Sequence, residues 1–178
     1  MSLEARTRDA TTESLRRLRN AYGMFPVHDE RVGNDADYFE HGRRKAADGW
    51  LGDAAVWVTD AKDRVAMIRH PNAANEWGVP GGGHEPGETL SETARREVRE
   101  ETGLRCRLTD VLDVRRKEIF LETDPSERLF ALSVLFSGVR VGGELTVGDD
   151  VLDARWFDSP PERVLDFIEP QVERWRDG

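Results

Sequence analysis

The chain has 178 residues, enough for one domain with a sizeable hydrophobic core. Its formal net charge of −9 argues against nucleic acid as a bulk partner, because the phosphates would be repelled. No apolar run approaches the length that crosses a membrane, and no charged-then-apolar leader opens the chain, so we expect a cytoplasmic protein without membrane contact.

Acidic residues dominate the charge balance. Aspartate and glutamate supply 35 positions, whereas the lysines are Lys45, Lys62 and Lys117. A strongly acidic surface stays hydrated at high salt, so we hypothesise a halophilic protein from a salt-loaded cytoplasm. An unfolding midpoint that does not change from low to molar KCl would exclude this hypothesis.

The first fifty residues predict two helices, over residues 12–22, where Leu15 and Leu18 share one face, and over residues 36–47. The stretch between them, residues 26–34, is expected to be irregular. We assign residues 1–50 to an N-terminal helical extension packed on the core and residues 51–178 to the main domain. The extension either caps that core or acts as a dimerisation or lid element. A homodimer is therefore one outcome that the sequence leaves open.

The rest of the chain alternates between strand and helix patterns. Short runs of β-branched and apolar residues predict strands at residues 54–59, 64–69, 105–114, 118–122, 130–139 and 154–157. Helical patterns cover residues 90–102, 161–167 and 170–176. Strands on both sides of a central helix predict an α/β (α+β) fold, a mixed β-sheet sandwich flanked by helices.

The boundaries of the central helix are the most clearly marked in the chain. Thr89 is an N-cap residue and Glu92, three residues later, is its partner in a capping box. Gly103 lies where a helix stops. One helix over residues 90–102 follows from these signals.

A helical wheel places a carboxylate inside the apolar stripe of this helix. At about 100° per residue, Glu101 falls in the middle of the stripe and Glu97 on its edge. Glu100 is on the other side of Glu97, and Arg96 borders this acidic edge, where it is able to hold a carboxylate in place. The stripe itself consists of Leu90, Ala94 and Val98.

An acidic helix is usually solvated, but these carboxylates are not on the outward side. A carboxylate in an apolar face is costly unless a cation or hydrogen-bond donors compensate it. Glu97, Glu100 and Glu101 together offer hard oxygen ligands of the kind that Mg²⁺ or Mn²⁺ accepts. The residues therefore predict a divalent metal site.

The segment also matches a known motif at every specified position. Residues 82–104 read G-x5-E-x7-R-E-U-x-E-E-x-G-U, where U is apolar, and Trp77 opens a W-x-x-P-G-G lead-in. This pattern resembles the Nudix box of the Nudix hydrolase family. The resemblance implies a Nudix fold in which a loop-helix-loop unit carries Mg²⁺ and cuts a diphosphate linked to another group.

The resemblance also implies roles for the residues that match the box. Glu97 and Glu101 would be the usual metal ligands, with Glu100 as a third. A backbone carbonyl of Gly81 or Gly82 would complete the metal site. Glu88 would pair with Arg96 and so fix the loop to the helix. Gly83 would be a structural residue of the same loop.

The expected chemistry is direct attack of water on phosphorus, for which a carboxylate not fully used by the metal must take the proton. Glu100 and Asp150 are the two main candidates for this base, and Glu97 is a further candidate. Asp150 precedes a segment that is similar to the family's late E-x-x-x-A-R-W-F region, although the family usually has glutamate there. The same residue is equally well explained as a plain turn residue.

Several further residues have two readings each. Arg115 and Arg116 either bind substrate phosphate or form a solvated turn. Trp77 is either a stacking platform for a base or, more simply, a packing residue. His84 reads as a solvated loop histidine rather than as a contact to substrate. Residues 81–83 read as a tight turn that glycine alone tolerates rather than as a phosphate cradle, because no Gly-Lys-Ser/Thr follows.

The function expected from these features is Mg²⁺-dependent hydrolysis of a pyrophosphate bond in a nucleotide sugar, a dinucleotide, ADP-ribose or a nucleoside triphosphate. The proline typical of the ADP-ribose subgroup is absent, since Ile119 and Phe120 stand there. A non-catalytic nucleotide-binding regulatory Nudix module is the alternative, but such modules lose box carboxylates and this chain has kept all of them. An isoprenoid diphosphate isomerase would need a divergent box.

Overall fold

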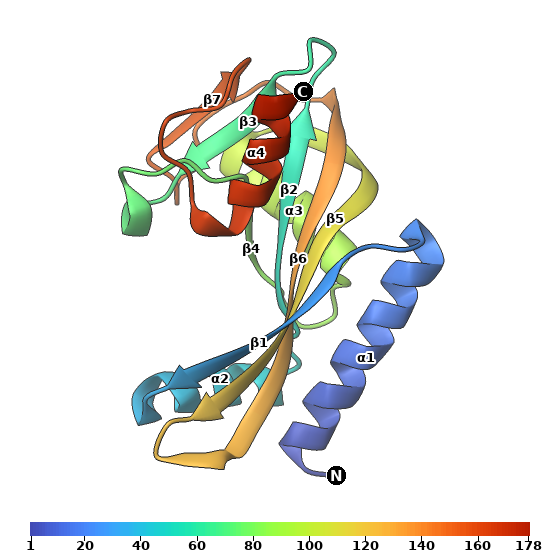
Figure 1. The fold of residues 1–178 in the computed structure, drawn as a ribbon, viewed down its shortest axis with the longest axis vertical. Helices are drawn as coiled ribbons and strands as arrows, with labels where there is room; N and C mark the ends of the chain where they lie inside the picture. Colours follow the sequence, from blue (N-terminus) through green and yellow to red (C-terminus); the bar gives the residue numbers. More distant parts are fainter. The chain divides into compact units, whose positions relative to one another are not determined.

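The structure is a computed structural model that describes all of residues 1–178 (Figure 1). One mixed sheet holds the strands in the order β1-β5-β6-β2-β3-β7, with β4 paired to β2. The strands are β1 Val27–Asn34, β2 Gly52–Thr59, β3 Val65–Arg69, β4 Gly81–Gly83, β5 Arg105–Leu121, β6 Asp124–Gly142 and β7 Asp153–Phe157. The helices are α1 Leu3–Tyr22, α2 Ala36–Ala47, α3 Leu90–Thr102 and α4 Glu169–Asp177, with short 3-10 turns at Pro71–Ala73 and Asp166–Ile168.

The chain forms two compact units, and several elements contribute residues to both. Unit 1 consists of Met1–Ala54, Gly82–Thr93 and Asp110–Leu135. Unit 2 consists of Ala55–Gly81, Ala94–Thr109 and Phe136–Gly178. Strands β2, β5 and β6 and helix α3 therefore run through both units.

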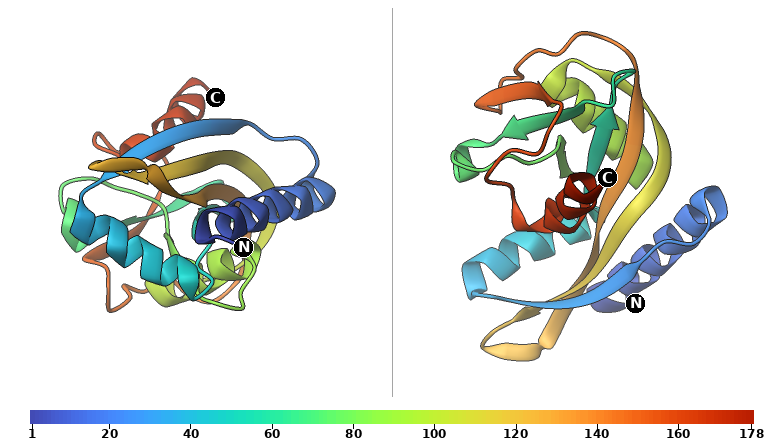
Figure 2. Two further views of the ribbon diagram at one scale, coloured as in Figure 1. Left: turned by 90° about the horizontal axis from the view of Figure 1, so that it is seen from below. Right: turned by 45° about the horizontal axis from the view of Figure 1, so that its top comes forward.

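Unit 1 has its own apolar core between its helices and one sheet face. Phe39 and Ala46 of α2 pack with Leu129 of β6, and partly buried Leu3, Ile119 and Leu121 surround them. Both helices thus cover the same face of these strands, as the left view of Figure 2 shows. At the edge of the sheet, β1 runs parallel to β5, from Val27 beside Val114 to Asn34 beside Leu121.

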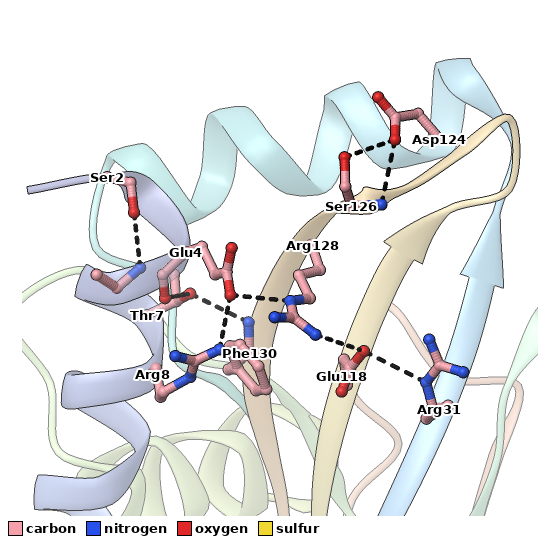
Figure 3. A network of polar contacts seen from close by, with 11 residues as sticks. Ser2, Glu4, Thr7, Arg8, Arg31, Glu118, Asp124, Ser126, Arg128 and Phe130 are labelled. Carbon is pink, nitrogen blue, oxygen red and sulfur yellow. Dashed lines mark hydrogen bonds and ion pairs between the residues drawn. The ribbon is translucent and has the colours of Figure 1, made fainter.

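Helix α1 provides a hydrogen-bond acceptor for a backbone N–H of β6 at a point where the neighbouring strand β2 has not yet begun. The Leu132 N–H donates to the Leu51 carbonyl just before β2, at 2.9 Å. Two residues earlier the Phe130 N–H donates to the Thr7 side chain of α1 at 3.1 Å (Figure 3). Since an unpaired strand edge is costly when buried, this bond ties α1 to the sheet.

A chain of ion pairs crosses the same strands. Glu4 of α1 binds Arg128 of β6 at 2.8 Å, Arg128 lies 3.5 Å from Glu118 of β5, and Glu118 binds Arg31 of β1 at 3.3 Å (Figure 3). These side chains are partly exposed, so each pair contributes little alone. Together they link α1, β6, β5 and β1.

Unit 2 places helices α3 and α4 on opposite faces of its strands (Figure 1). Trp57 of β2 meets Trp175 of α4 edge to face, with ring centroids 5.5 Å apart. Because side chains alternate along a strand, Val56 and Val58 face the other way, and both are fully buried. Strand β3 pairs antiparallel with β7, from Val65 beside Phe157 to Arg69 beside Asp153.

The predicted fold class is confirmed, and the predicted helices 36–47 and 90–102 have the observed bounds. The division into residues 1–50 and 51–178 stays a prediction. Within the first fifty residues, the expected irregular stretch 26–34 is wrong, because Val27–Asn34 is the edge strand β1. Helix α1 begins at Leu3 rather than residue 12, and Thr7 and Thr11 continue its buried face.

Two further predictions of secondary structure are wrong because backbone hydrogen bonds to distant segments determine the conformation. Residues 105–114 and 118–122 are one strand, β5, because β1 pairs with it through the charged segment Arg115–Lys117. The predicted helix 161–167 is largely absent. The Trp77 N–H donates to the Arg163 carbonyl and the Leu165 N–H to the Trp77 carbonyl, which holds this segment extended.

Gly52 provides a test of the close packing in unit 1. Its φ is +132°, and a Cβ atom there would lie 1.8 Å from the Leu132 carbonyl oxygen. We expect Gly52→Ala to lower the free energy of unfolding by about 3 kcal/mol or more, measured by urea denaturation. The matched control is Gly42→Ala in α2, where a Cβ meets nothing within 4 Å. That change should stabilise by about 0.5–1 kcal/mol, and equal effects at both sites would contradict the packing described.

Candidate active site

Helix α3 begins as its capping box predicts. The Thr89 N–H donates to the Glu92 carboxylate at 2.8 Å, and the Glu92 N–H donates to the Thr89 hydroxyl at 3.2 Å. At the other end Gly103 has φ +70° and its N–H donates to the Arg99 carbonyl at 2.9 Å. The box residues of the helix therefore have the angular positions that the wheel assigned.

The loop before α3 is fixed by His84, which is 6% exposed rather than solvated as expected. The Leu51 N–H donates to His84 Nδ1 at 3.2 Å, so the protonated Nε2 donates to the Glu88 carbonyl at 2.6 Å. The Glu88 carboxylate in turn accepts from the Glu85 N–H at 3.2 Å and from the Thr93 hydroxyl at 2.7 Å. Glu88 thus joins the loop to the first turn of α3, and its predicted pairing with Arg96 stays a prediction.

The expected tight turn at residues 81–83 is wrong. Gly81–Gly83 is the short strand β4, and none of the three has a positive φ. A Cβ at Gly83 would meet nothing within 4 Å, so no close contact requires glycine there.

Glu101 is the buried carboxylate that the wheel predicted. It is 4% exposed, and Ala94 and Val98 on the same helix face are fully buried. The Gly81 N–H donates to its Oε1 at 2.8 Å. Burial, together with the negative charges of Glu97, Asp150 and Glu100, raises the pKa of Glu101 to about 8.

The second oxygen of Glu101 has no hydrogen-bond partner although it is buried. His70 directly follows β3, and its Nε2 lies 2.9 Å from Oε2 without making a hydrogen bond. A buried carboxylate oxygen without a donor is the place where a cation would be stabilised. Glu101 Oε2 thus has the character of a ligand that a divalent ion would bind.

Arg96 holds the two other box carboxylates. Its Nη1 lies 2.8 Å from Glu97 Oε1 and 3.2 Å from Glu100 Oε2. The Arg96 and Glu97 side chains are 13% and 14% exposed, whereas Glu100 is 56% exposed. Glu97 is therefore a largely desolvated neighbour of Glu101, and Glu100 is accessible to water.

Asp150 reaches this neighbourhood because the end of α3 is capped by the loop that carries it. The Thr146 N–H donates to the Thr102 carbonyl at 2.8 Å and the Gly148 N–H to the Glu101 carbonyl at 3.0 Å. A Cβ at Gly148 would lie 2.2 Å from the Glu100 carbonyl oxygen, so this approach requires glycine. Asp150 is exposed, yet close enough for its charge to raise the pKa of Glu101.

These acidic groups are neighbours without enclosing a common point. No three histidine, cysteine, aspartate or glutamate side chains are placed to hold an ion together. Arg96 accounts for this in part, since Glu97 and Glu100 turn an oxygen to its guanidinium group. All of these residues belong to unit 2.

The three predicted substrate-binding residues lie in other surroundings. Trp77 packs against Phe157 with ring centroids 4.7 Å apart, and the guanidinium groups of Arg69 and Arg155 lie 4.9 and 5.5 Å from its ring. In unit 1, Arg116 binds the Asp29 carboxylate with two bonds of 2.6 and 3.0 Å.

The third of these residues, Arg115, lies 3.8 Å from Asp113. Binding of substrate by Trp77, Arg115 and Arg116 stays a prediction. His70 was not predicted, because a single histidine after a strand carries no recognisable signal.

Comparison with known proteins assigns the chain to a family. A family model of the NUDIX domain matches residues 51–170. The chain belongs to the Nudix family. An ADP-ribose pyrophosphatase of Methanocaldococcus jannaschii is 31% identical over 127 residues, which cover 68% of this chain and 72% of that protein. A nucleoside triphosphatase NudI of Enterobacter sp. (strain 638) is 32% identical over 98 residues, covering 53% and 70%.

Solved structures agree on the fold. A MutT protein from Methanosarcina mazei Go1 superposes with a TM-score of 0.54 at 21% identity, covering 71% of this chain and 93% of that one. A UDP-X diphosphatase has a TM-score of 0.52 at 20% identity, covering 71% and 60%. The predicted resemblance to Nudix hydrolases is thus confirmed. In addition, none of the helices has the length and apolar character needed to cross a membrane.

The raised pKa of Glu101 predicts how the stability of the metal-free protein depends on pH. In the unfolded chain this carboxyl ionises near 4.5, whereas in the folded protein it keeps its proton until about 8. Between these values the folded state binds more protons, so the free energy of unfolding should fall as the pH rises from about 4.5 to about 8.

Glu101→Gln should remove this decline, measured by urea unfolding with chelator present. Glu92→Gln, an exposed change on the same helix, should leave it in place. A wild-type decline that persists in Glu101→Gln would contradict the assignment of the pKa.

Proposed function

We propose that this protein is a divalent-metal-dependent hydrolase that cleaves a pyrophosphate bond in a nucleoside diphosphate linked to another group, or in a nucleoside triphosphate. The observation that carries the proposal is Glu101, a 96% buried carboxylate with one partnerless oxygen in a complete Nudix box. The names of the two relatives support the same bond type.

The residues divide the work according to their exposure. Glu101 and Glu97 are the largely buried carboxylates and would hold the ion, with Glu100 as a third ligand and a carbonyl of Gly81 or Gly82 completing the site. Arg96 holds the Glu97 and Glu100 carboxylates next to its guanidinium group through two ion pairs. Mg²⁺, with Mn²⁺ as the alternative, would neutralise phosphate oxygens and lower the pKa of the attacking water.

The proton of the attacking water requires a base that keeps contact with solvent. Glu100 and Asp150 are both exposed, and both lie close enough to influence Glu101. Glu97 is less suitable, because it is 14% exposed and bound to Arg96. We therefore propose that Glu100 or Asp150 is the base that accepts the proton of the attacking water.

ADP-ribose is the first substrate to test, because the M. jannaschii pyrophosphatase of that name matches over 68% of this chain. Nucleoside triphosphates come second, following the NudI relative. A non-catalytic nucleotide-binding module stays the alternative, and the complete set of box carboxylates argues against it. Cytoplasmic location, adaptation to salt and a homodimer stay predictions.

The test is release of phosphate or nucleotide product from ADP-ribose, dinucleotides, sugar nucleotides and nucleoside triphosphates with Mg²⁺. We expect turnover of at least one of these, and a loss of about 100-fold or more in kcat/KM for Glu101→Gln. The matched control is Glu92→Gln, which makes the same change of charge on the same helix and preserves the capping box. A Glu101→Gln protein that cleaves at the wild-type rate would refute the assignment, and binding of nucleotide without turnover would favour the regulatory module.

A further inference from the structure

His70 is placed beside the buried carboxylate by rigid backbone. It directly follows β3, whose residue Ile68 exchanges two backbone hydrogen bonds with Gly78, at 2.9 and 2.8 Å. On the other edge of β3, the Leu152 N–H donates to the Arg69 carbonyl at 2.8 Å. The position of the His70 backbone is therefore set on both sides.

The contact between His70 and Glu101 is short but is not a hydrogen bond. Nε2 lies 2.9 Å from Oε2, yet Oε2 has no hydrogen-bond partner. A ring nitrogen that stabilised the carboxylate by donation would point its N–H at the oxygen. A ring nitrogen this close to a buried carboxylate oxygen, without a hydrogen bond between them, has the spacing of two ligands of one shared ion.

The separation agrees with ligands of one metal ion. Metal–nitrogen and metal–oxygen bonds of about 2.1 Å that meet at a right angle place their donor atoms about 3 Å apart. The observed 2.9 Å requires almost no movement of either side chain. His70 is 38% exposed, so an ion can approach the ring from solvent, while Glu101 is 4% exposed and anchored by Gly81.

The other histidines have different surroundings. His28 lies 3.0 Å from Asp113 on β5, and both nitrogens of His84 are used within the loop before α3. His41 is an exposed residue of α2. Only His70 combines an accessible ring with a partnerless buried carboxylate oxygen.

We propose that His70 Nε2 is a direct protein ligand of the divalent ion held by Glu101, which makes this site a mixed nitrogen and oxygen site. This inference rests on the proposed function, because it needs an ion at Glu101. Imidazole suits Mn²⁺, Co²⁺ and Zn²⁺ better than Mg²⁺, which prefers oxygen ligands alone. The site therefore selects transition-metal ions over Mg²⁺ more strongly than carboxylates alone would.

The experiment titrates Mn²⁺ into the metal-free protein and records pulsed electron paramagnetic resonance spectra of the complex. A ligating imidazole gives a ¹⁴N coupling to Mn²⁺, and we expect it in the wild type and in His41→Gln, the matched control. His70→Gln should lose the coupling. It should also weaken Mn²⁺ binding about tenfold more than Mg²⁺ binding, measured by competition between the two ions.

The outcomes separate the two proposals. A His70→Gln protein with an unchanged ¹⁴N coupling and an unchanged ratio of Mn²⁺ to Mg²⁺ affinity would overturn the role of His70 and leave the proposed function intact. A wild-type protein that binds neither ion, or a Glu101→Gln protein that binds Mn²⁺ as tightly as wild type, would overturn both. Loss of the coupling in His70→Gln and in Glu101→Gln alike would support both.

Discussion

The arrangement of the site depends on one constraint, the burial of the Glu101 carboxylate in the apolar face of α3. Val98, one turn earlier on this face, is fully buried, and Glu101 itself is 4% exposed. A single N–H, from Gly81, compensates one oxygen. The other oxygen has no hydrogen-bond partner, and in the proposed function a divalent cation compensates it.

The surroundings of Glu101 keep further negative charge near it at little cost in repulsion. Glu100 and Asp150 lie on the solvent side, where water screens their repulsion, and Glu97 is offset by the guanidinium of Arg96. The cap of α3 by the Gly148 N–H brings the Asp150 loop to this side of the helix. Burial is the main cause of the raised pKa of Glu101, and the acidic groups that the folded protein holds near it raise this pKa further.

The sequence predicts those parts of the fold and site that are determined locally. Helix α3 has the predicted bounds because its cap, capping-box partner and terminal glycine are all within the segment, and the burial of Glu101 follows from its place on the wheel. Strand β1 was missed because its residues are mostly polar, and only the pairing with β5, some ninety positions away, makes it a strand. The first turns of α1 were missed because the threonines on its buried face do not read as apolar.

Contacts between distant segments explain the remaining differences at the site. His84 reads as an exposed loop residue until the Leu51 N–H and the Glu88 carbonyl are placed on its two nitrogens. His70 is part of no local sequence pattern. Its place in the site is visible only from its contact with Glu101, thirty-one positions later. Family resemblance indicated the helix and the carboxylates proposed as ligands, whereas the side chains that a second segment brings to them required the structure.

The most direct test of the central claim is the response of stability to Mg²⁺ in solution above the pKa of Glu101, where the carboxylate is ionised. A ligand that binds the folded state alone raises the free energy of unfolding with the logarithm of its concentration. The urea midpoint of the wild-type protein should rise steadily with added Mg²⁺, and that of Glu101→Gln should stay constant. Equal rises in both proteins, or none in either, would show that no cation compensates the buried carboxylate.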